Sequence, residues 1–547
     1  MSIASMNEQN ARSPTMGFLA SSVMSRQVRV FVLCATVILL LAALLRTYNI
    51  AQRSLWLDEA IAANISRGTL SQTLTLTRDL HSAPITDPLI LYAVEKINAS
   101  PLAVRIPSFL ASVLAVFLML WFVTIPSIDY KTAGLAALML SVSAAQIRYA
   151  QEVREYSLSV LYAAVLLYIF LSYISKKDKP RSPIPLYIAL FGAPLIQYGL
   201  VLFSFGILSS LFLFALINEE RVRRIVQVLV ASGFLALGGL VSLFLTLRYQ
   251  WGDDAWYLKD DFWTPGTSLL HFAVKHTHHL IMFLLPGMAA ASISTIAILI
   301  YMVISIRART LPPLAVLTFL SCALVLICSL RHLYPYGGIR QCLFLAPAVC
   351  LFASESLVQV IKKLPAKAAP FGFAAVVCVV IVSGAIEIRS LKPYAEVEDI
   401  QQVLHSLQGH IQPGDNVYIY PAAVFAVDFY VKERDPRFIY GDYHQQTPEK
   451  YLPEIVNGLN RRADRLWIVF SHVYRDENQR ILQDLSKDWD VAPVLSATGS
   501  ALYLATRRPS TTGDAATEAF QTIPAVPDHT HDSFWDWNVR NSRHPAN

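Results

Sequence analysis

Residues 53–60 read Arg-Ser-Leu-Trp-Leu-Asp-Glu-Ala and follow directly after an apolar run at residues 30–47. The run resembles a membrane-spanning helix, which needs about 20 predominantly apolar residues. Trp56 suits the membrane–water interface, and the adjacent acids Asp58 and Glu59 stand just beyond it. An acid there is wet enough to stay ionised and close enough to the bilayer to meet a lipid-linked reactant, so the pair is a candidate general base. The alternative is a solvated acidic pair beside an interfacial tryptophan.

The composition indicates that much of the chain has the bilayer as its solvent. Of its 547 residues, 54% are hydrophobic and only 15% are charged, whereas soluble proteins have about 25% charged residues. This composition excludes a chain disordered throughout, a disulfide-stapled secreted module and a nucleic-acid binder. All six cysteines lie in apolar runs, which predicts helix packing and not disulfides or a cysteine metal site.

Eleven apolar runs predict a polytopic α-helical membrane protein. They cover residues 30–47, 103–124, 132–146, 157–175, 184–198, 200–217, 225–246, 284–306, 311–330, 341–361 and 368–387. The fifth and sixth runs are divided only by Gln197, Tyr198 and Gly199, so counting them as two spans is an interpretation.

The distribution of basic residues supports eleven spans. If the N-terminus is cytoplasmic, the inner segments hold sixteen Lys and Arg, and the short outer loops hold four: Arg148, Arg154, Arg331 and Arg340. Because short cytoplasmic loops favour basic residues, this asymmetry predicts a cytoplasmic N-terminus and an extracytoplasmic C-terminus in the inner or plasma membrane.

The expected organisation has four parts. They are a cytoplasmic tail at 1–29, a transmembrane domain at 30–390 with outer loops at 48–102, 147–156, 247–283 and 331–340, an α/β domain at 391–508, and a disordered tail at 509–547. The α/β assignment rests on a helical pattern at 396–407 that is followed by alternating strand and helix signals. The tail is rich in Ser, Thr, Pro, His and Asp.

A second polar cluster follows the third span and includes Glu152, Arg154 and Glu155. On a helical turn the two acids would share a face, with the arginine pointing elsewhere. Polar residues this dense at the ends of two spans must be hydrated or paired. They are either site residues or an ion-pair network that caps helix ends.

Basic residues in other outer loops suggest phosphate binding. Arg331, His332 and Arg340 precede the tenth span against the positive-inside bias, and guanidinium groups bind phosphate oxygens bidentately. Contact with ordinary lipid headgroups is the alternative. Lys275 adds a basic group in the loop at 247–283, where His276, His278 and His279 without a nearby Cys or acid fit interfacial residues better than metal ligands.

Three motifs, in order, resemble the GT-C glycosyltransferases, most nearly the protein O-mannosyltransferase and lipid A aminoarabinose transferase type. They are residues 54–60 after the first span, Leu-Ala-Val-Arg-Ile-Pro-Ser at 102–108, and Gln-Ile-Arg-Tyr-Ala-Gln-Glu-Val-Arg-Glu-Tyr-Ser at 146–157. Residues 334–340, Tyr-Pro-Tyr-Gly-Gly-Ile-Arg, and the C-terminal domain are similar to bacterial members of unassigned specificity. The likeness covers roughly residues 30–507, and each motif alone is weak.

The resemblance implies a transferase that moves a sugar from a polyprenyl-phosphate carrier to a glycolipid, glycan or protein acceptor. Asp58 matches the family's first-loop acid, with Glu59 as its neighbour, and Glu152 and Arg154 fall in the second loop, where acceptor contacts are expected. Arg340, with Arg331 and His332, would hold the carrier phosphate. Residues 81–89 depart from the compact His-Pro-Pro-Leu-Tyr element of many relatives, which makes Asp87 a further candidate acid.

The reactants define the expected mechanism. A carboxylate removes the acceptor proton while cations stabilise the departing phosphate, and a single displacement inverts the anomeric centre. No cofactor is required, because arginine can neutralise the phosphate; a divalent metal is compatible with this chemistry.

Two other functions fit a chain with many spans. A lipid or solute transporter or flippase should carry polar groups or broken helices near the bilayer midplane, and often repeated halves. A polymerase or ligase of surface polysaccharide shares the substrate class, and only the acceptor would distinguish it.

Overall fold

The computed structural model describes residues 26–80, 83–175, 182–217, 220–250, 256–391, 397–431, 435–441, 456, 458–459 and 464–508. Residues 1–25 of the predicted tail at 1–29 and the whole predicted tail at 509–547 lie outside the described residues, whereas residues 26–29 are helical. His81, the first residue of the element that departs from the family pattern, also lies outside them.

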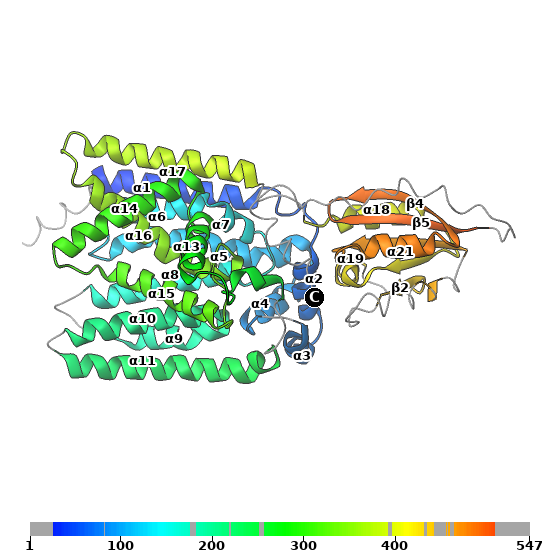
Figure 1. Cartoon of the computed structure of the whole chain (residues 1–547), viewed down its shortest axis with the longest axis horizontal. Coiled ribbons are helices and arrows are strands. Elements are labelled where there is room, and N and C mark those ends of the chain that lie inside the picture. Colours follow the sequence, from blue (N-terminus) through cyan, green and yellow to red (C-terminus); the bar gives the residue numbers. More distant parts are fainter. Residues whose placement is uncertain are drawn as a thin grey trace, which may run out of the picture.

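The described chain forms a bundle of long helices, with an α/β domain beyond one end of the bundle (Figure 1). Among the described residues, nine helices are long and apolar enough to cross a membrane. Eight of them are α1 (Arg26–Thr47), α5 (Pro101–Trp121), α8 (Tyr156–Ile174), α10 (Gly199–Leu216), α11 (Arg221–Ser242), α14 (Gly287–Arg307), α15 (Pro313–Leu330) and α17 (Ala369–Leu391). The ninth joins the 3₁₀ turn η4 (Arg340–Leu345) to α16 (Ala346–Ile361). With the shorter apolar helices α6 (Tyr130–Val142) and α9 (Ile184–Ile196), they confirm the predicted polytopic fold.

Two interruptions show how sequence divides the bundle. The chain is extended at Gln197, between α9 and α10, so the long apolar stretch forms two helices as predicted. The adjacent Gly199 has no room for a side chain, because a Cβ there would lie 2.4 Å from the ring of Phe344. The predicted span at 132–146 is wrong in its extent: the helix ends at Val142, Ser143 is extended, and a separate short helix, α7 (Ala144–Tyr149), follows.

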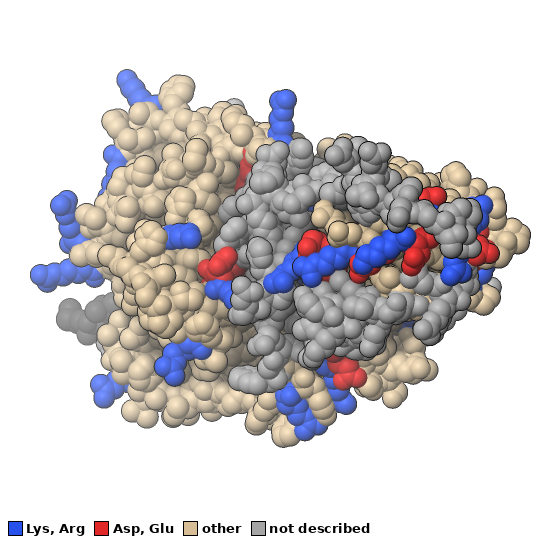
Figure 2. All heavy atoms as spheres, turned by 45° about the vertical axis from the view of Figure 1, so that its right-hand side comes forward, with Lys and Arg blue, Asp and Glu red and all other residues tan. Residues whose placement is uncertain are grey.

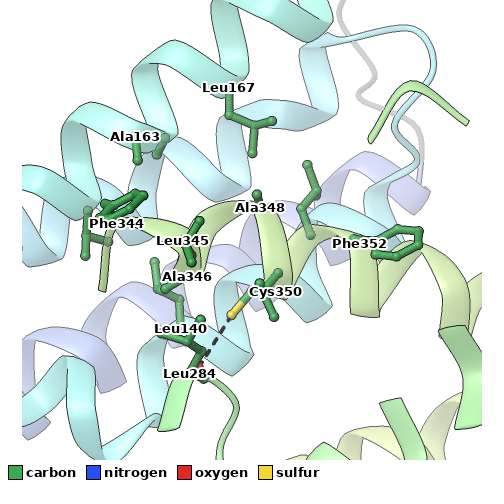
Figure 3. Close-up of a cluster of buried hydrophobic side chains, with 14 of the residues drawn as sticks. Leu140, Ala163, Leu167, Leu284, Phe344, Leu345, Ala346, Ala348, Cys350 and Phe352 are labelled. Carbon is green, nitrogen blue, oxygen red and sulfur yellow. Dashed lines mark hydrogen bonds between the residues drawn. The ribbon is translucent and has the colours of Figure 1, made fainter. Parts of the chain in front are cut away.

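The core of the bundle lies around α16. In the most apolar 18-residue stretch of the span formed by η4 and α16, 78% of the residues are buried. The corresponding value for α1 is 6%, so α16 is central in the bundle and α1 is peripheral. Figure 3 shows Ala346, Ala348 and Cys350 of α16 facing side chains that include Leu140 of α6 and Leu167 of α8. Small residues on α16 allow this close approach. All six cysteines are free.

Shorter elements build the end of the bundle nearest the α/β domain. They are α2 (Leu57–Arg67), α3 (Leu70–Leu80) and α4 (Thr86–Glu95) (Figure 1). Two further short elements, η3 (Trp256–Asp261) and α13 (Leu269–Leu284), precede α14. The helix α11 reaches this end through a π-helical segment, η2 (Leu243–Leu247), and α12 (Arg248–Gln250). The 3₁₀ turn η1 (Phe122–Thr124) closes α5 at the opposite end.

The C-terminal unit is the predicted small α/β domain. Its elements are α18 (Ile400–His410), β1 (Asn416–Ile419), η5 (Pro421–Ala423), α19 (Val424–Tyr430), β2 (Phe438–Tyr440), β3 (Arg465–Ser471), α21 (Glu477–Leu485), β4 (Trp489–Ala497) and β5 (Ser500–Arg507). The sheet has the order β2-β1-β3-β5-β4, with β1 parallel to β2 and β3, and β5 antiparallel to β3 and β4. Its apolar cluster continues into Leu55, Leu57 and Ala60 of the acidic segment.

Candidate functional site

The acidic segment enters α2 at Leu57, so Asp58 and Glu59 lie in the first turn of a helix. Trp56 precedes the helix in an extended conformation and provides no side-chain cap. The cap comes instead from Glu398, whose Oε2 accepts a hydrogen bond of 3.1 Å from the Leu57 N–H. Successive helical residues project about 100° apart, so the two acids face different surroundings.

Asp58 faces a cluster of cationic side chains. Its Oδ2 lies 2.9 Å from Arg340 Nη1, and the two side chains are 23% and 15% exposed. Burial opposes ionisation of Asp58, but Arg340, followed by Arg154 and His472, holds its pKa below the ordinary value. Asp58 is therefore an ionised carboxylate that solvent or a substrate can still reach, as a general base must be.

Glu59 is buried in an ion pair with Arg105 of α5. Its Oε2 and Oε1 lie 2.7 Å and 3.0 Å from two guanidinium nitrogens, and the side chains are only 2% and 1% exposed. Glu59 Oε1 also accepts from the Val153 N–H at 3.0 Å. Arg105 in turn donates to the carbonyls of Arg53 and Ser54. The pair therefore ties the acidic segment to α5 and to the second polar cluster.

Arg154 and two aromatic rings surround the Asp58–Arg340 pair. The Arg340 guanidinium lies 5.6 Å from the ring centroids of both Trp56 and Tyr156, and that of Arg154 lies 5.8 Å from Tyr156. Burial lowers the pKa of Arg154, but neighbouring Tyr156, Glu155 and Asp58 hold it above the ordinary value. The first and second polar clusters of the sequence therefore meet at one site.

The second cluster is not helical between α7 and α8, so the expected shared face of Glu152 and Glu155 does not form. Glu152 pairs back to Arg148 at 2.7 Å, and Glu155 lies 3.5 Å from Arg154. All four side chains are buried. The ion-pair network proposed as the alternative is present, and through Arg154 it also borders Asp58.

Asp87 joins the same site from the first turn of α4. Its side chain is buried, and its Oδ2 has no hydrogen-bond partner among the described residues. Burial, reinforced by the Glu155 carboxylate, raises the pKa of Asp87 to about 7 against the opposing effect of Arg154. Asp87 is therefore a buried acid beside Arg154 that takes up a proton near neutral pH.

Arg331, His332 and Lys275 lie apart from this cluster. His332 stacks on Phe262 with ring centroids 5.2 Å apart, and its Nε2 lies 2.9 Å from the Trp263 carbonyl. Arg331 and Lys275 are exposed, and within the described chain no hydrogen bond or ion pair joins any of the three to Asp58. The structure therefore groups Asp58, Glu59, Asp87, Glu152, Arg154 and Arg340, and leaves these three basic residues outside.

Tyr156 belongs to the second polar cluster of the sequence, but sequence reasoning missed Arg105, Glu398 and His472 as members of the site. Arg105 carried a usable signal, since a lone charge inside an apolar span must be paired. Glu398 and His472 carried none, because their contacts depend on how the C-terminal domain packs on α2. Among the described residues no group of three or more His, Cys, Asp or Glu side chains could hold a metal.

Solved structures with a similar fold include ArnT and AglB. ArnT from Cupriavidus metallidurans, bound to undecaprenyl phosphate, is 13% identical with a TM-score of 0.51 over 88% of this chain and 98% of ArnT. The archaeal oligosaccharyltransferase AglB from Archaeoglobus fulgidus, in complex with an inhibitory peptide and a dolichol-phosphate, is 10% identical with a TM-score of 0.52 over 89% of this chain and 75% of AglB. Both have the GT-C fold, which confirms the expected architecture. No family model matches the sequence, and no curated protein does so.

Proposed function

We propose, from the premise of a GT-C fold, that this protein is a membrane glycosyltransferase that moves a sugar from a polyprenyl-phosphate carrier to a cell-envelope acceptor. One observation supports this function above the others: Asp58, an ionised and partly exposed carboxylate, lies 2.9 Å from Arg340 at the end of the membrane bundle. A base beside a phosphate-binding cation is what transfer from a sugar phosphate requires.

In this proposal the site faces the periplasm or the cell exterior. The C-terminal domain and α2 lie beyond one end of the bundle (Figure 1), while Lys and Arg side chains project from the opposite end (Figure 2). Basic residues mark the helix ends there, for example Lys131 of α6, Arg221 of α11, Arg307 of α14 and Lys362 after α16. Basic helix ends favour the cytoplasmic side, which supports a cytoplasmic N-terminus.

Each reacting bond has an assigned group. The acceptor hydroxyl gives its proton to the Asp58 carboxylate as its oxygen forms a bond to the anomeric carbon. The bond from that carbon to the carrier phosphate breaks, and the bonding electrons leave with the phosphate. Arg340 and Arg154 stabilise the resulting charge. One displacement inverts the anomeric configuration, whether the sugar is a hexose or a pentose.

Neighbouring residues have different proposed roles. Both Glu59 oxygens are engaged by Arg105 and the Val153 N–H, so we assign Glu59 to positioning the start of α2 and not to proton transfer. Asp87 and Glu152 shape the substrate side of the site with Arg154. Arg331, His332 and Lys275 would contact the carrier headgroup as it approaches. Two arginines at Asp58 make a resident cofactor unnecessary, although a divalent ion remains compatible with a phosphate substrate.

The position of the polar site favours an enzyme over a transporter or flippase. Asp58, Arg154 and Arg340 lie at the ends of spans and in the segments beyond them, whereas transporter sites lie near the bilayer midplane. A polysaccharide polymerase or ligase would use the same donor class and the same groups. It differs in its acceptor, so acceptor identity decides between the two.

The test is deletion of the gene followed by mass spectrometry of glycolipids, surface glycans and glycoproteins. We expect one sugar to disappear from one of these classes and to return with the wild-type chain but not with Asp58→Asn. The exposed acid Asp79 of α3 provides a matched control, so Asp79→Asn should restore the sugar. Restoration by Asp58→Asn, or no change in any class on deletion, would reject the proposed function.

A further inference from the structure

The C-terminal domain is hydrogen-bonded directly to the acidic segment. Ser54 Oγ donates to Asp399 Oδ1 at 3.0 Å, and the Leu55 N–H donates to Tyr430 Oη at 2.8 Å. Further along α2, the Arg67 guanidinium donates to the carbonyls of Asp428 and Phe429 at 2.9 Å and 2.8 Å. Together with the shared apolar cluster, these bonds fix the domain on the helix that carries Asp58.

One buried carboxylate, that of Glu398, connects this helix to the domain's sheet. Its Oε2 accepts from the Leu57 N–H at 3.1 Å and from Ser471 Oγ at 3.2 Å. Its Oε1 lies 2.5 Å from His472 Nδ1. A carboxylate partner favours the charged form of an imidazole. Glu398 therefore holds both the residue before Asp58 and a histidine at the end of β3.

The backbone of His472 indicates that its position is enforced. Its φ is 51°, in the left-handed region that residues other than glycine seldom adopt. The β4–β5 turn packs tightly against the residues next to Glu398. A Cβ on Gly499 in that turn would lie 2.3 Å from the Val397 carbonyl oxygen. Strained conformations persist where the surrounding structure over-determines them, and they cluster at functional sites.

His472 stands beside the Asp58 site. Its ring centroid lies 6.4 Å from that of Trp56, the residue whose ring also meets the Arg340 guanidinium at 5.6 Å. Electrostatic interaction with His472 lowers the pKa of Asp58, as do the interactions with Arg340 and Arg154. An imidazole from the C-terminal domain and a guanidinium from the membrane domain thus meet around Trp56.

We propose that the C-terminal domain completes the site by contributing His472 as a positioning residue, which Glu398 fixes next to Trp56 so that it acts with Arg340 on the Asp58 carboxylate. The inference rests on the proposed role of Asp58 as the base. It gives the domain a direct part in catalysis, because a base must stay ionised and aimed to take a proton.

The charged and titratable groups around the imidazole come from several elements. Glu398 and Tyr474 contact it from the C-terminal domain. The Trp56 ring faces it from the membrane domain. Asp58 of α2 interacts with it electrostatically, and Arg340 and Arg154 act on the same carboxylate from η4 and the segment before α8. Because the two arginines stay charged at all relevant pH values, loss of His472 should weaken the ionisation of Asp58 without abolishing it.

The experiment uses the full-length protein in detergent and the variant His472→Asn. Asparagine tolerates the left-handed backbone, so the change removes the imidazole without adding strain. His410→Asn is the matched control, since His410 lies exposed in the same domain and its Nδ1 lies 2.8 Å from the Ser406 carbonyl. The first readout is the pH at which a water-soluble carbodiimide labels Asp58, measured by mass spectrometry, because this reagent reacts with the protonated carboxyl.

We expect His472→Asn to raise the labelling midpoint of Asp58 by about 0.5 to 1 pH unit, and His410→Asn to leave it unchanged. The acid limb of the pH–rate profile should move up with it, so at pH values on that limb turnover should fall about 3- to 10-fold, with little change in the KM for the lipid carrier. Glu398→Gln should give the same two shifts while keeping near-wild-type thermal unfolding, because an amide oxygen still caps α2.

Superimposed labelling curves for His472→Asn and His410→Asn would overturn the inference, even with transfer measured normally in the wild type. Absence of transfer by the wild-type chain from any polyprenyl-phosphate sugar would instead reject the proposed function. The labelling readout does not depend on turnover, so the two failures are distinguishable.

Discussion

At the scale of single residues, the adjacent carboxylates of Asp58 and Glu59 have different surroundings. Asp58 is partly exposed and forms an ion pair with Arg340. Both oxygens of Glu59 are instead engaged in a buried ion pair with Arg105. A rotation of about 100° between successive helical residues is enough to separate them. The sequence predicts both as candidate acids, and only their surroundings distinguish a reacting group from a positioning one.

Replacement of Asp58 tests its role as the base. We expect Asp58→Asn to reduce transfer by about 10²- to 10⁴-fold, since an amide cannot accept the acceptor's proton. Because the pKa of Asp58 is held below its ordinary value, wild-type activity should persist as the pH falls and be lost only when the carboxylate protonates. Radiolabelled sugar transfer measured across pH checks both points, with Asp79→Asn as control. Unchanged turnover in Asp58→Asn would remove the acid from its role.

Replacement of Arg340 tests phosphate recognition. Arg340→Ala should raise the KM for the lipid carrier by about 10- to 100-fold, because a hydrogen bond to a charged group contributes about 1.5 to 3 kcal/mol. The KM for the acceptor should change much less. Arg389→Ala, at the exposed end of α17, serves as the matched control. Equal loss for carrier and acceptor would count against a phosphate-binding arginine.

Asp87 predicts a pH-dependent stability. Its pKa in the fold, about 7, lies above the ordinary value of 3.8 because burial and Glu155 disfavour its charge. The folded state therefore holds the proton more tightly, and this contribution to stability is complete at acidic pH and is lost as the pH rises toward 7. Thermal unfolding between pH 5 and 8 should decline in the wild type and be flatter in Asp87→Asn. Parallel curves for the two would contradict this assignment.

Sequence reasoning identifies most residues of the site but not their contacts. Asp58, Arg154 and Arg340 can be recognised from the sequence because they are charged residues at the ends of apolar runs. Such residues are costly near the membrane unless they have a function or a partner, and their position is a local property of the sequence. The bond between Ser54 and Asp399 joins positions 345 residues apart, and no local pattern encodes it. The cap of α2 by Glu398 was missed for the same reason.

At the scale of elements, the ion pair of Glu59 and Arg105 joins the start of α2 to α5. We expect Glu59→Gln to destabilise the fold by about 3 to 5 kcal/mol, since it leaves a buried guanidinium without its counter-charge. Glu220→Gln breaks an exposed pair with Arg223 and should cost less than about 1 kcal/mol. Thermal unfolding in detergent compares them, and equal melting temperatures would show that the Glu59 pair has no such role.

Apolar runs predict helices better than they predict helix ends. The division at Gln197 could be anticipated from a polar residue beside Gly199, where side chains of the tenth span leave no room for a Cβ. The end of α6 at Val142 could not, because Ser143 lies within a run that stays apolar up to Gln146. The break after Val142 separates α6 from α7, which leads into the second polar cluster near α2. This break depends on tertiary contacts and not on the local sequence.

At the scale of the whole molecule, the proposal requires one orientation in the membrane. Thr69→Cys, at the exposed start of α3, should react with a membrane-impermeant maleimide in intact spheroplasts. Arg309→Cys, in the exposed loop after α14, should react only after permeabilisation, and the wild-type chain gives the background of its native cysteines. The reverse pattern would place Asp58 in the cytosol and reject the proposed function.

The fold as a whole was accessible from sequence because the bilayer imposes simple rules on it. Span length, charge asymmetry and the order of the motifs were enough to predict the GT-C architecture. The relation between the two domains was not accessible. It depends on complementary surfaces around Leu55 and Tyr430, and such surfaces have no periodic signature in the sequence.

The cap on α2 also sets an order of events during biosynthesis. Glu398 follows Leu57 by 341 residues, and the histidine that it holds lies further still along the chain. While the ribosome is still making the later spans, the helix bearing Asp58 has no partner for its first N–H. Asp58 therefore reaches its final surroundings only after most of the chain has been made. A product truncated before Glu398 should insert into the membrane normally but lack transferase activity.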